Sequence, residues 1–160
     1  YGGFMLTQRG VKVIEYNARL GDPEAMNVLC LMKTDFLKVC DQIIGGSLSK
    51  NSVEFEELST VCKYAVPNGY PNKPEKGFVV DCKIEDLDVY LASVKSSGGQ
   101  VVACGSRTAA AIGKDKNVFV AEKFAERKIS SVGGDLFHRK DIGTKELISR
   151  RIDRMEKILR

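Results

Sequence analysis

The feature that most constrains the fold of this 160-residue chain is the clustering of proline in one short stretch. Three of its four prolines, Pro67, Pro71 and Pro74, lie there. Proline fixes φ and lacks a backbone N–H, so neither a helix interior nor a central strand continues through such a stretch. Residues 67–74 are therefore predicted to form a long, stiffened loop, with separate elements before and after it.

The chain before this loop begins with a predicted β-hairpin. Two apolar runs, residues 4–7 and 11–17, are separated by a short turn that contains Gly10. Asp22 as N-cap and Pro23 at the first helical position then predict the start of a helix.

This helical part is expected to contain a second start and a clear end. Thr34-Asp35 predicts the restart, and Gly45-Gly46 predicts the end. The following residues are polar and include three glutamates, which is typical of a surface connection. We therefore expect a first unit over residues 1–46 and a connection over residues 47–58.

The chain after residue 58 shows short strands followed by helices. Strands are predicted at 60–66, 78–82, 88–94, 100–104 and 109–112. Asp115 is predicted to cap a helix over 117–130, and Thr144 to cap a last helix. This order predicts an α+β domain with mostly antiparallel strands over residues 59–147, followed by a helical tail over 148–160.

Charge and cysteine content argue against several classes of protein. Lys and Arg number 25 against 21 Asp and Glu, and a net charge of +4 is no nucleic-acid footprint by itself. No apolar run approaches the length of a membrane span, and no secretory signal is visible. Five cysteines without a CxxC pair, together with a single histidine, His138, argue against a disulfide framework or a zinc site. We expect a protein of the reducing cytoplasm with neither membrane nor nucleic-acid partners.

The end of the second hairpin strand holds the densest set of reactive side chains. Side chains alternate along a strand, so Glu15, Asn17 and Arg19 are predicted to share one face with Val11 and Val13. Carboxylate and amide oxygens suit Mg²⁺, which keeps several waters and phosphate oxygens as its other ligands. A guanidinium group binds phosphate or carboxylate bidentately. These side chains therefore predict a site for a metal and a phosphate.

The turn that follows fits either a binding site or a purely structural role. Gly21 permits a close turn, and the free N–H groups of the next helix favour anions. In the structural interpretation, Glu15 and Asn17 are solvated, Arg19 pairs with Asp22, and Asp22 is only a helix cap.

Three other segments carry polar side chains that could either bind a ligand or serve the structure alone. Residues 105–108, Gly-Ser-Arg-Thr, lack the spacing of a phosphate-binding loop and are predicted to form a plain turn. Arg139 and Asp141 either pair with each other or line a substrate cleft. The basic residues of the last helix are interpreted as a solvated face, and its apolar stripe as a docking surface.

Several motifs resemble one enzyme family. Arg19-Leu20-Gly21-Asp22-Pro23-Glu24, preceded by residues 15–17, resembles the signature of the phosphoribosylamine–glycine ligases (glycinamide ribonucleotide synthetases) of the ATP-grasp superfamily. Residues 1–6 resemble the strand before that signature. Asn68-Gly69-Tyr70-Pro71 resembles a loop of the family's C-terminal domain, and residues 137–143 resemble its closing segment.

The resemblance implies a fold and a reaction. Residues 1–46 would be the C-terminal segment of the ATP-grasp domain, and residues 59–147 the ligase C-terminal domain. Such enzymes use ATP to join glycine to 5-phosphoribosylamine in purine biosynthesis, through a glycyl phosphate. The remaining N-terminal part of the enzyme would be the main partner of this chain.

The resemblance also implies roles for individual residues. Glu15 and Asn17 would hold Mg²⁺ or Mn²⁺ on ATP, and Arg19 would face phosphate. Gly21 and Asp22 would contact substrate. From the proline-rich loop, Tyr70 and Lys76 would cover the phosphoribosyl group, although a stiff surface connection with solvated lysines fits that loop equally well.

The chain departs from the family pattern in two respects, and two alternative functions remain open. The lysine-bearing part of the nucleotide site is absent from this chain, and the tail beyond residue 148 runs past the usual end of the family. One alternative is another ATP-grasp ligase, such as a carboxylase-type enzyme. The other is a non-catalytic binding module that uses the basic last helix.

Overall fold

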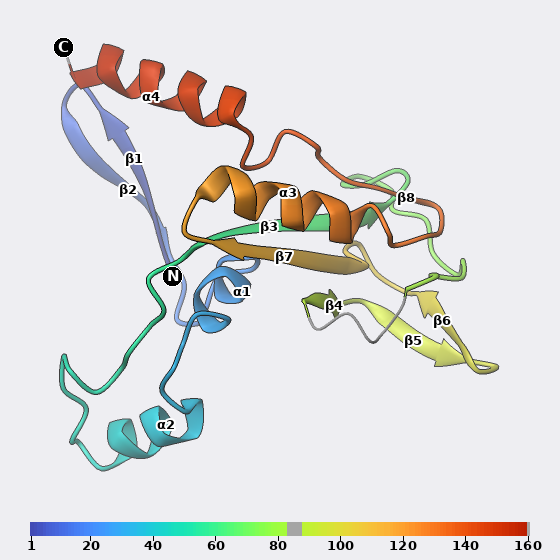
Figure 1. Cartoon of the computed structure of the whole chain (residues 1–160), viewed down its shortest axis with the longest axis horizontal. Coiled ribbons are helices and arrows are strands. Elements are labelled where there is room, and N and C mark those ends of the chain that lie inside the picture. Colours follow the sequence, from blue (N-terminus) through green and yellow to red (C-terminus); the bar gives the residue numbers. More distant parts are fainter. Residues whose placement is uncertain (83–87, 160) are drawn as a thin grey trace.

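The computed structural model describes residues 1–82 and 88–159. Its centre is an antiparallel sheet with the strand order β4-β7-β3-β8. These strands are β3 (Ser59–Pro67), β4 (Val89–Leu91), β7 (Ala109–Asp115) and β8 (Leu136–Phe137). Helix α3 (Val118–Ile129) covers one face of the sheet, and the short helix α1 (Glu24–Leu29) lies against the other (Figure 1).

The alternation of side chains along β3 explains how one strand serves both helices. Val61 packs against Ala121 and Ala125 of α3, whereas Cys62 packs with Met26 on the α1 side. Cores of this kind are stabilised by the removal of apolar surface from water.

Helix α3 lies unusually close to the sheet because β7 carries small residues there. A Cβ atom at Gly113 would overlap the carbonyl oxygen of Ala121, so only glycine fits at that position. Ala109 and Ala111 are completely buried next to it. The small residues of β7 therefore set the distance between helix and sheet.

One charged side chain is buried beneath α3. The Lys63 ammonium group lies 2.7 Å from Glu122 Oε1, 2.6 Å from Glu126 Oε2 and 2.9 Å from the carbonyl oxygen of Lys140. His138 Nε2 lies 3.0 Å from the other oxygen of Glu126. This network attaches the segment after β8 to the sheet.

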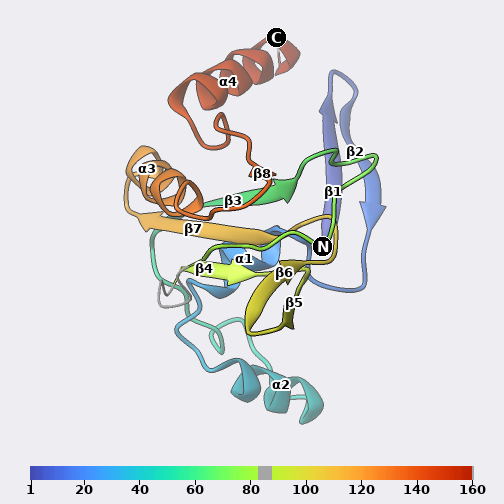
Figure 2. The same ribbon diagram turned by 90° about the vertical axis from the view of Figure 1, so that its right-hand side faces the viewer.

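The remaining elements project from this centre. They are the hairpin of β1 (Gly2–Thr7) and β2 (Gly10–Tyr16), the hairpin of β5 (Val94–Ser97) and β6 (Gln100–Ala103), helix α2 (Phe36–Ile44) and helix α4 (Lys145–Leu159). The first hairpin and α4 lie at the same end of the molecule in two perpendicular views (Figures 1 and 2). None of the helices in residues 1–82 and 88–159 is both long and apolar enough to span a membrane.

Most predicted elements are confirmed. The structure is α+β with antiparallel strands, and the first hairpin, the restart at Asp35 and the cap at Thr144 are present. The Asp35 carboxylate accepts hydrogen bonds from Leu37 N and Lys38 N, and the Thr144 hydroxyl accepts one from Leu147 N. Residues 98–99 form the turn of the β5–β6 hairpin.

Four predictions about elements are wrong. Residues 78–82 form isolated bridges at Val79 and Asp81 rather than a strand. The predicted strand 88–94 is divided, because β4 ends at Leu91 and β5 begins at Val94. The caps of α1 and α3 are Pro23 and Asn117, not Asp22 and Asp115, because both carboxylates have other hydrogen-bond partners.

Candidate functional site

A small polar cleft lies where the first hairpin meets the sheet. It has a volume of about 270 Å³. It is lined by Tyr1, Glu15, Asn17, Arg19, Gly21, Asp22, Glu24 and Arg107. The structure thus brings together five residues that the sequence proposed as site residues: Glu15, Asn17, Arg19, Gly21 and Asp22.

The hairpin register places Glu15 in this cleft. Glu15 pairs with Gly3 and Val13 pairs with Phe4, so a register shift occurs at Ile14. Because of this shift, Val11 and Val13 lie on the face of the hairpin opposite to Glu15, and the prediction of a shared face is wrong for both valines. Gly3 leaves room for the carboxylate side chain, since a Cβ there would lie 3.2 Å from Glu15 Cγ.

Gly21 lies in close contact with two side chains of the cleft. It is buried, and a Cβ atom there would collide with the Glu24 carboxylate and lie 3.0 Å from the Tyr1 ring. Its carbonyl oxygen accepts a hydrogen bond from Ala25 N at 2.8 Å. Gly21 therefore allows the turn to close directly onto the first residues of α1.

Asp22 is anchored by the sheet. Its carboxylate accepts a hydrogen bond from the Tyr64 hydroxyl at 2.8 Å and another from Arg107 Nη1 at 2.7 Å. It neither caps α1 nor pairs with Arg19, whose guanidinium donates instead to the carbonyl oxygen of Leu20 at 3.0 Å. The Arg19 side chain thus bonds to the backbone of the next residue while it lines the cleft.

The electrostatics of this anchor involve two further tyrosines. Burial, followed by the hydrogen bond to Asp22, raises the pKa of Tyr64 above its ordinary value, so the phenol remains a donor at neutral pH. Interaction with the Tyr70 side chain is the largest cause that raises the pKa of Arg107. The Arg107 guanidinium also stacks on the Tyr64 ring, 5.5 Å from its centroid.

Neither Tyr70 nor Lys76, from the proline-rich segment, lines the cleft. Tyr70 raises the pKa of Arg107, which does line it, and Lys76 is exposed. The substrate-binding roles of Tyr70 and Lys76 stay predictions.

Arg107 is the site residue that the sequence reasoning missed. The segment 105–108 is a turn, as predicted, but its arginine points into the cleft. The available signal was weak: a single cation after a strand, without phosphate-loop spacing. Its partner Asp22 is 85 positions away along the chain.

The donor set in the cleft fits a hard divalent cation. Glu15 and Asn17 offer a carboxylate and an amide oxygen in one small cavity. Within the described ranges, no group of three or more His, Cys, Asp and Glu side chains gathers. Mg²⁺ is typically held by one or two protein oxygens, with waters and phosphate oxygens as its other ligands, so this pair is of the right kind.

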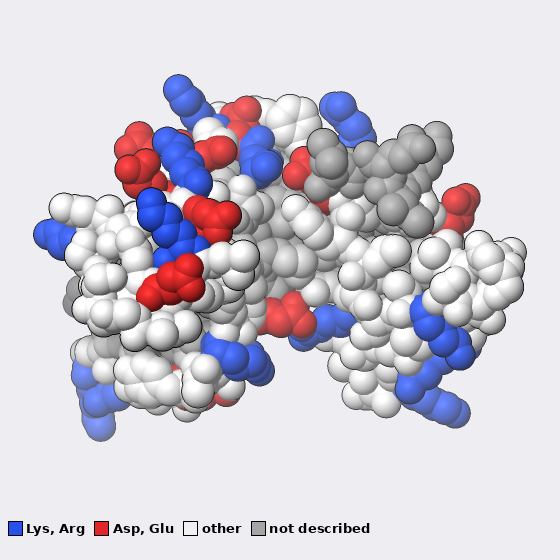
Figure 3. Space-filling view, turned by 90° about the horizontal axis from the view of Figure 1, so that it is seen from below, with Lys and Arg blue, Asp and Glu red and all other residues white. Residues whose placement is uncertain are grey.

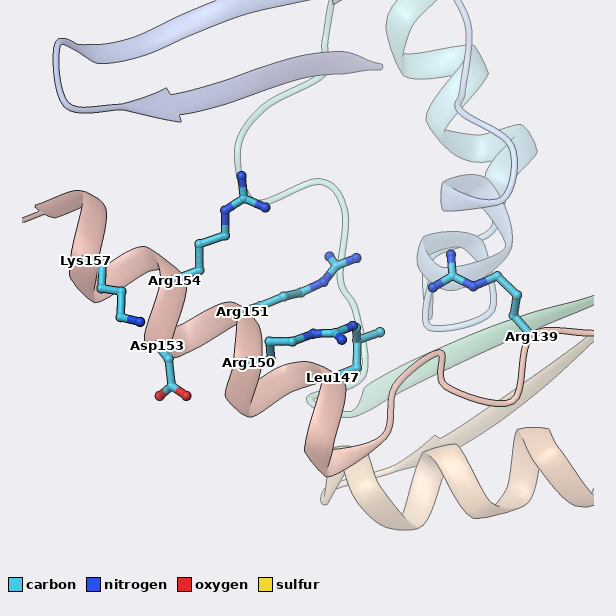
Figure 4. A pocket seen from close by; sticks show the side chains of 7 residues that line it. All are labelled: Arg139, Leu147, Arg150, Arg151, Asp153, Arg154 and Lys157. Atoms are coloured by element: carbon cyan, nitrogen blue, oxygen red, sulfur yellow. The ribbon is translucent and has the colours of Figure 1, made fainter.

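A second hollow lies along α4 and is strongly basic. It has a volume of about 540 Å³ and is lined by Arg139, Leu147, Arg150, Arg151, Asp153, Arg154 and Lys157. Asp153 projects away from the arginines of α4 (Figure 4). Arg139 forms a bidentate pair with Asp141, at 3.0 and 2.8 Å, and does not line the first cleft.

The face shown in Figure 3 differs from this basic hollow. On the face shown in Figure 3, basic and acidic side chains are interspersed over one half of the molecule, and much of the surface is uncharged. The α4 hollow is therefore the feature on which a non-catalytic binding role would depend.

The fold and the cleft define a compact antiparallel α+β domain with a polar site at the foot of an appended hairpin. A family model described as "Phosphoribosylglycinamide synthetase, C domain" matches residues 60–145. The chain belongs to this family. The resemblance inferred from the sequence motifs is confirmed.

Individual relatives agree with this assignment. Phosphoribosylamine–glycine ligases of Methanococcus maripaludis and Methanocaldococcus jannaschii are 50% and 45% identical over 99% and 100% of this chain. The chain spans 37% of the length of each of these two relatives. The family model ends at residue 145, yet these alignments extend into α4, so the tail is shared with these relatives.

A solved structure supports the same fold. The crystal structure of the phosphoribosylamine–glycine ligase of Thermotoga maritima matches with a TM-score of 0.75 and 28% identity. The match covers 88% of this chain and 36% of that protein.

Proposed function

We propose that this chain acts as the C-terminal part of a phosphoribosylamine–glycine ligase, which joins glycine to 5-phosphoribosylamine with ATP in purine biosynthesis. The observation that carries the proposal is the match of nearly the whole chain to ligases of that name, at 45–50% identity for the two relatives above. The charged cleft at the foot of the hairpin supports it. The proposal includes the cytoplasmic location predicted from the cysteine content.

The proposed chemistry needs no side-chain nucleophile. The glycine carboxylate attacks the γ-phosphorus of ATP and releases ADP, which gives glycyl phosphate. The amine of phosphoribosylamine then attacks the carbonyl carbon, phosphate leaves, and the amine loses a proton. In reactions of this class the protein mainly positions the reactants and stabilises charge.

Glu15, Asn17 and Arg19 are the residues proposed to do this work. Glu15 and Asn17 would hold Mg²⁺ or Mn²⁺, and the bound ion would neutralise phosphate charge as the γ-phosphoryl group moves. The Arg19 guanidinium would contact phosphate or acyl-phosphate oxygens. Gly21 would let the backbone approach the substrate. Asp22 would fix the turn that carries Arg19 and Gly21.

The surface of the first 46 residues supports their assignment to the ATP-grasp part of the enzyme. The hairpin exposes apolar side chains, including Val11, Val13 and Ile14, each more than half exposed. Exposed apolar patches of this kind mark contact surfaces. The preceding part of the enzyme is the proposed partner.

The test is a metal-ligand substitution in the complete enzyme. We expect Glu15→Ala to lower kcat by about 100-fold or more and to raise the Mg²⁺ concentration needed for half-maximal activity, because the metal contributes several kcal/mol to the transition state. ADP release that depends on glycine and phosphoribosylamine is the measurement. Glu57→Ala, in the exposed connection before β3, is the matched control.

The two alternatives give different outcomes in the same assay. Another ATP-grasp ligase would release ADP with a different carboxylate and amine and not with glycine and phosphoribosylamine. A non-catalytic module would tolerate Glu15→Ala and would lose its partner when residues 144–160 are deleted. Either result would overturn the proposed reaction.

A further inference from the structure

Arg107 occupies the junction between the cleft and the sheet. Its Nη1 donates to Asp22 Oδ2 at 2.7 Å and to the Asp22 carbonyl oxygen at 3.3 Å. The same guanidinium stacks on the Tyr64 ring. One side chain thus joins the turn after β2 to the strand β3.

The backbone that carries Arg107 is held firmly. The Arg107 carbonyl oxygen accepts a hydrogen bond from Ser93 N at 2.9 Å. The next residue, Thr108, is completely buried and is bonded through its N–H to Ala65 and through its carbonyl oxygen to Ala92. The guanidinium is therefore presented to the cleft from a rigid edge of the sheet.

The turn that it holds is joined to the hairpin by a hydrogen bond from the Tyr1 amino group to the Arg19 carbonyl oxygen at 3.1 Å. Beyond the short bonds that start α1, the described contacts of the 19–22 turn with the sheet domain run through the Asp22 residue, to Tyr64 and Arg107. Removal of Arg107 would leave Asp22 with the single hydrogen bond from Tyr64. A charge-assisted bond would be lost, and such bonds are about twice as strong as neutral ones.

We propose that Arg107 is a positioning residue for the ligase reaction. It clamps Asp22 against the sheet and so fixes the turn that carries Arg19 and Gly21 next to Glu15 and Asn17. The proposal rests on the proposed function. It assigns to Arg107 no contact with the reacting atoms; it acts through Asp22.

The clamp depends on the shape of arginine and not only on its charge. The planar guanidinium donates to both the carboxylate and the carbonyl oxygen of Asp22 while its face stacks on Tyr64. A lysine ammonium, in contrast, is a compact point charge. Arg107→Lys is therefore expected to behave nearly as badly as Arg107→Ala.

The experiment measures the complete enzyme with four variants: Arg107→Ala, Arg107→Lys, Asp22→Ala and the double variant Arg107→Ala/Asp22→Ala. We expect each to lower kcat by about 10- to 100-fold, a range typical for residues that orient a metal site. The Mg²⁺ concentration for half-maximal activity should rise. The double variant should be no worse than the worse single variant, because both residues act through one contact.

A matched control separates the clamp from a merely structural role. Arg127 stacks on Phe124 of α3 at 5.7 Å and lies away from the cleft, so Arg127→Ala should keep kcat and the metal requirement unchanged. If Arg107→Ala lowers the melting temperature but leaves kcat and the metal requirement at wild-type values, the clamp is wrong. Full recovery in Arg107→Lys, or additive losses in the double variant, would also overturn it.

The activity of the wild-type enzyme separates a failure of the proposed ligase reaction from a failure of the Arg107 clamp. If it releases no ADP with glycine and phosphoribosylamine, the proposed function fails and the clamp fails with it. If the wild type is active and Arg107→Ala equals it, only the clamp fails.

Discussion

Lys63 is the residue whose environment is most demanding. Its side chain is fully excluded from solvent, and its ammonium group has three oxygen partners. An ammonium ion has three donors, so all of them are used. Burying a charge is unfavourable unless it is paired and hydrogen-bonded, and this arrangement meets both conditions.

Substitution of Lys63 by methionine should therefore destabilise the protein although methionine fills similar space. Removal of one partner of a buried ion pair typically costs about 3–5 kcal/mol, and the partial exposure of both glutamates favours the lower end. Urea unfolding of the Lys63→Met protein would measure the loss. Lys123→Met, on the exposed side of α3, the helix that carries both glutamates, should change the unfolding free energy little. Equal stability of the two variants would contradict this account.

The same network predicts an acid-sensitive contribution from Glu126. Burial would raise the pKa of Glu126, but hydrogen bonds from Lys63 and His138 outweigh it and lower that pKa below its ordinary value. A carboxyl group with a lowered pKa stabilises the folded state above the unfolded pKa of about 4.3, and this stabilisation is lost as pH falls through the folded value.

Glu126→Gln should remove this contribution. The difference in unfolding free energy between wild type and Glu126→Gln is expected to be largest near pH 7 and to shrink below about pH 4, where the wild-type carboxylate is also neutralised. Urea unfolding from pH 7 to pH 3 measures it. A difference that stays constant across this range would show that Glu126 acts through packing alone.

At the scale of elements, local signals predicted most of the fold. Asp35, Thr144 and Gly45-Gly46 mark helix ends through contacts within a few residues, so a single sequence reveals them. Residues 78–82 were predicted as a strand on composition, yet only isolated bridges form there. Strand pairing depends on partners distant in the sequence, which a local pattern does not contain.

The residues of the candidate site also fall into those that local sequence signals predict and those that depend on distant contacts. Glu15, Asn17 and Arg19 were found because they are close in sequence and repeat with strand spacing. Arg107 was missed because its role arises only when strand β7 brings it beside Asp22. The register shift at Ile14 was also not predictable, since it is defined only by the pairing with Gly3 and Phe4 of the partner strand.

The contact of α3 with β7 gives a prediction about these two elements. Gly113→Ala should destabilise the protein by about 1–3 kcal/mol, as expected for overpacking, because the new Cβ would overlap the Ala121 carbonyl and force the helix outward. Gly45→Ala is the control, since a Cβ there lies 3.2 Å from the Asp41 carbonyl and needs only a small adjustment. Chemical unfolding of both variants provides the comparison, and a Gly113→Ala protein as stable as Gly45→Ala would refute the close contact.

At the scale of the whole molecule, the distribution of apolar surface is uneven. The sheet, α3 and the closing segment have a buried core, whereas α2 buries only Val39 among its described residues and exposes Leu37 and Ile44. The first hairpin is exposed on both faces. The buried core thus lies in the sheet domain. Exposed apolar side chains gather on the first hairpin and α2, in the part proposed to belong to the ATP-grasp unit, and also on α4, where Ile152 and Leu159 are more than half exposed.

This distribution predicts how the chain behaves when separated from the rest of the enzyme. We expect residues 1–160 alone to release no ADP, and activity to appear only when the preceding part of the enzyme is added, because apolar contact then covers the hairpin. Ile14→Arg should abolish this recovery. Ile14 is 61% exposed in the chain, so its replacement leaves the fold of the chain itself intact. Lys12→Arg, on the same strand, should recover normally. Release of ADP by residues 1–160 alone, or full recovery with Ile14→Arg, would show that this hairpin is not the surface that joins the two parts.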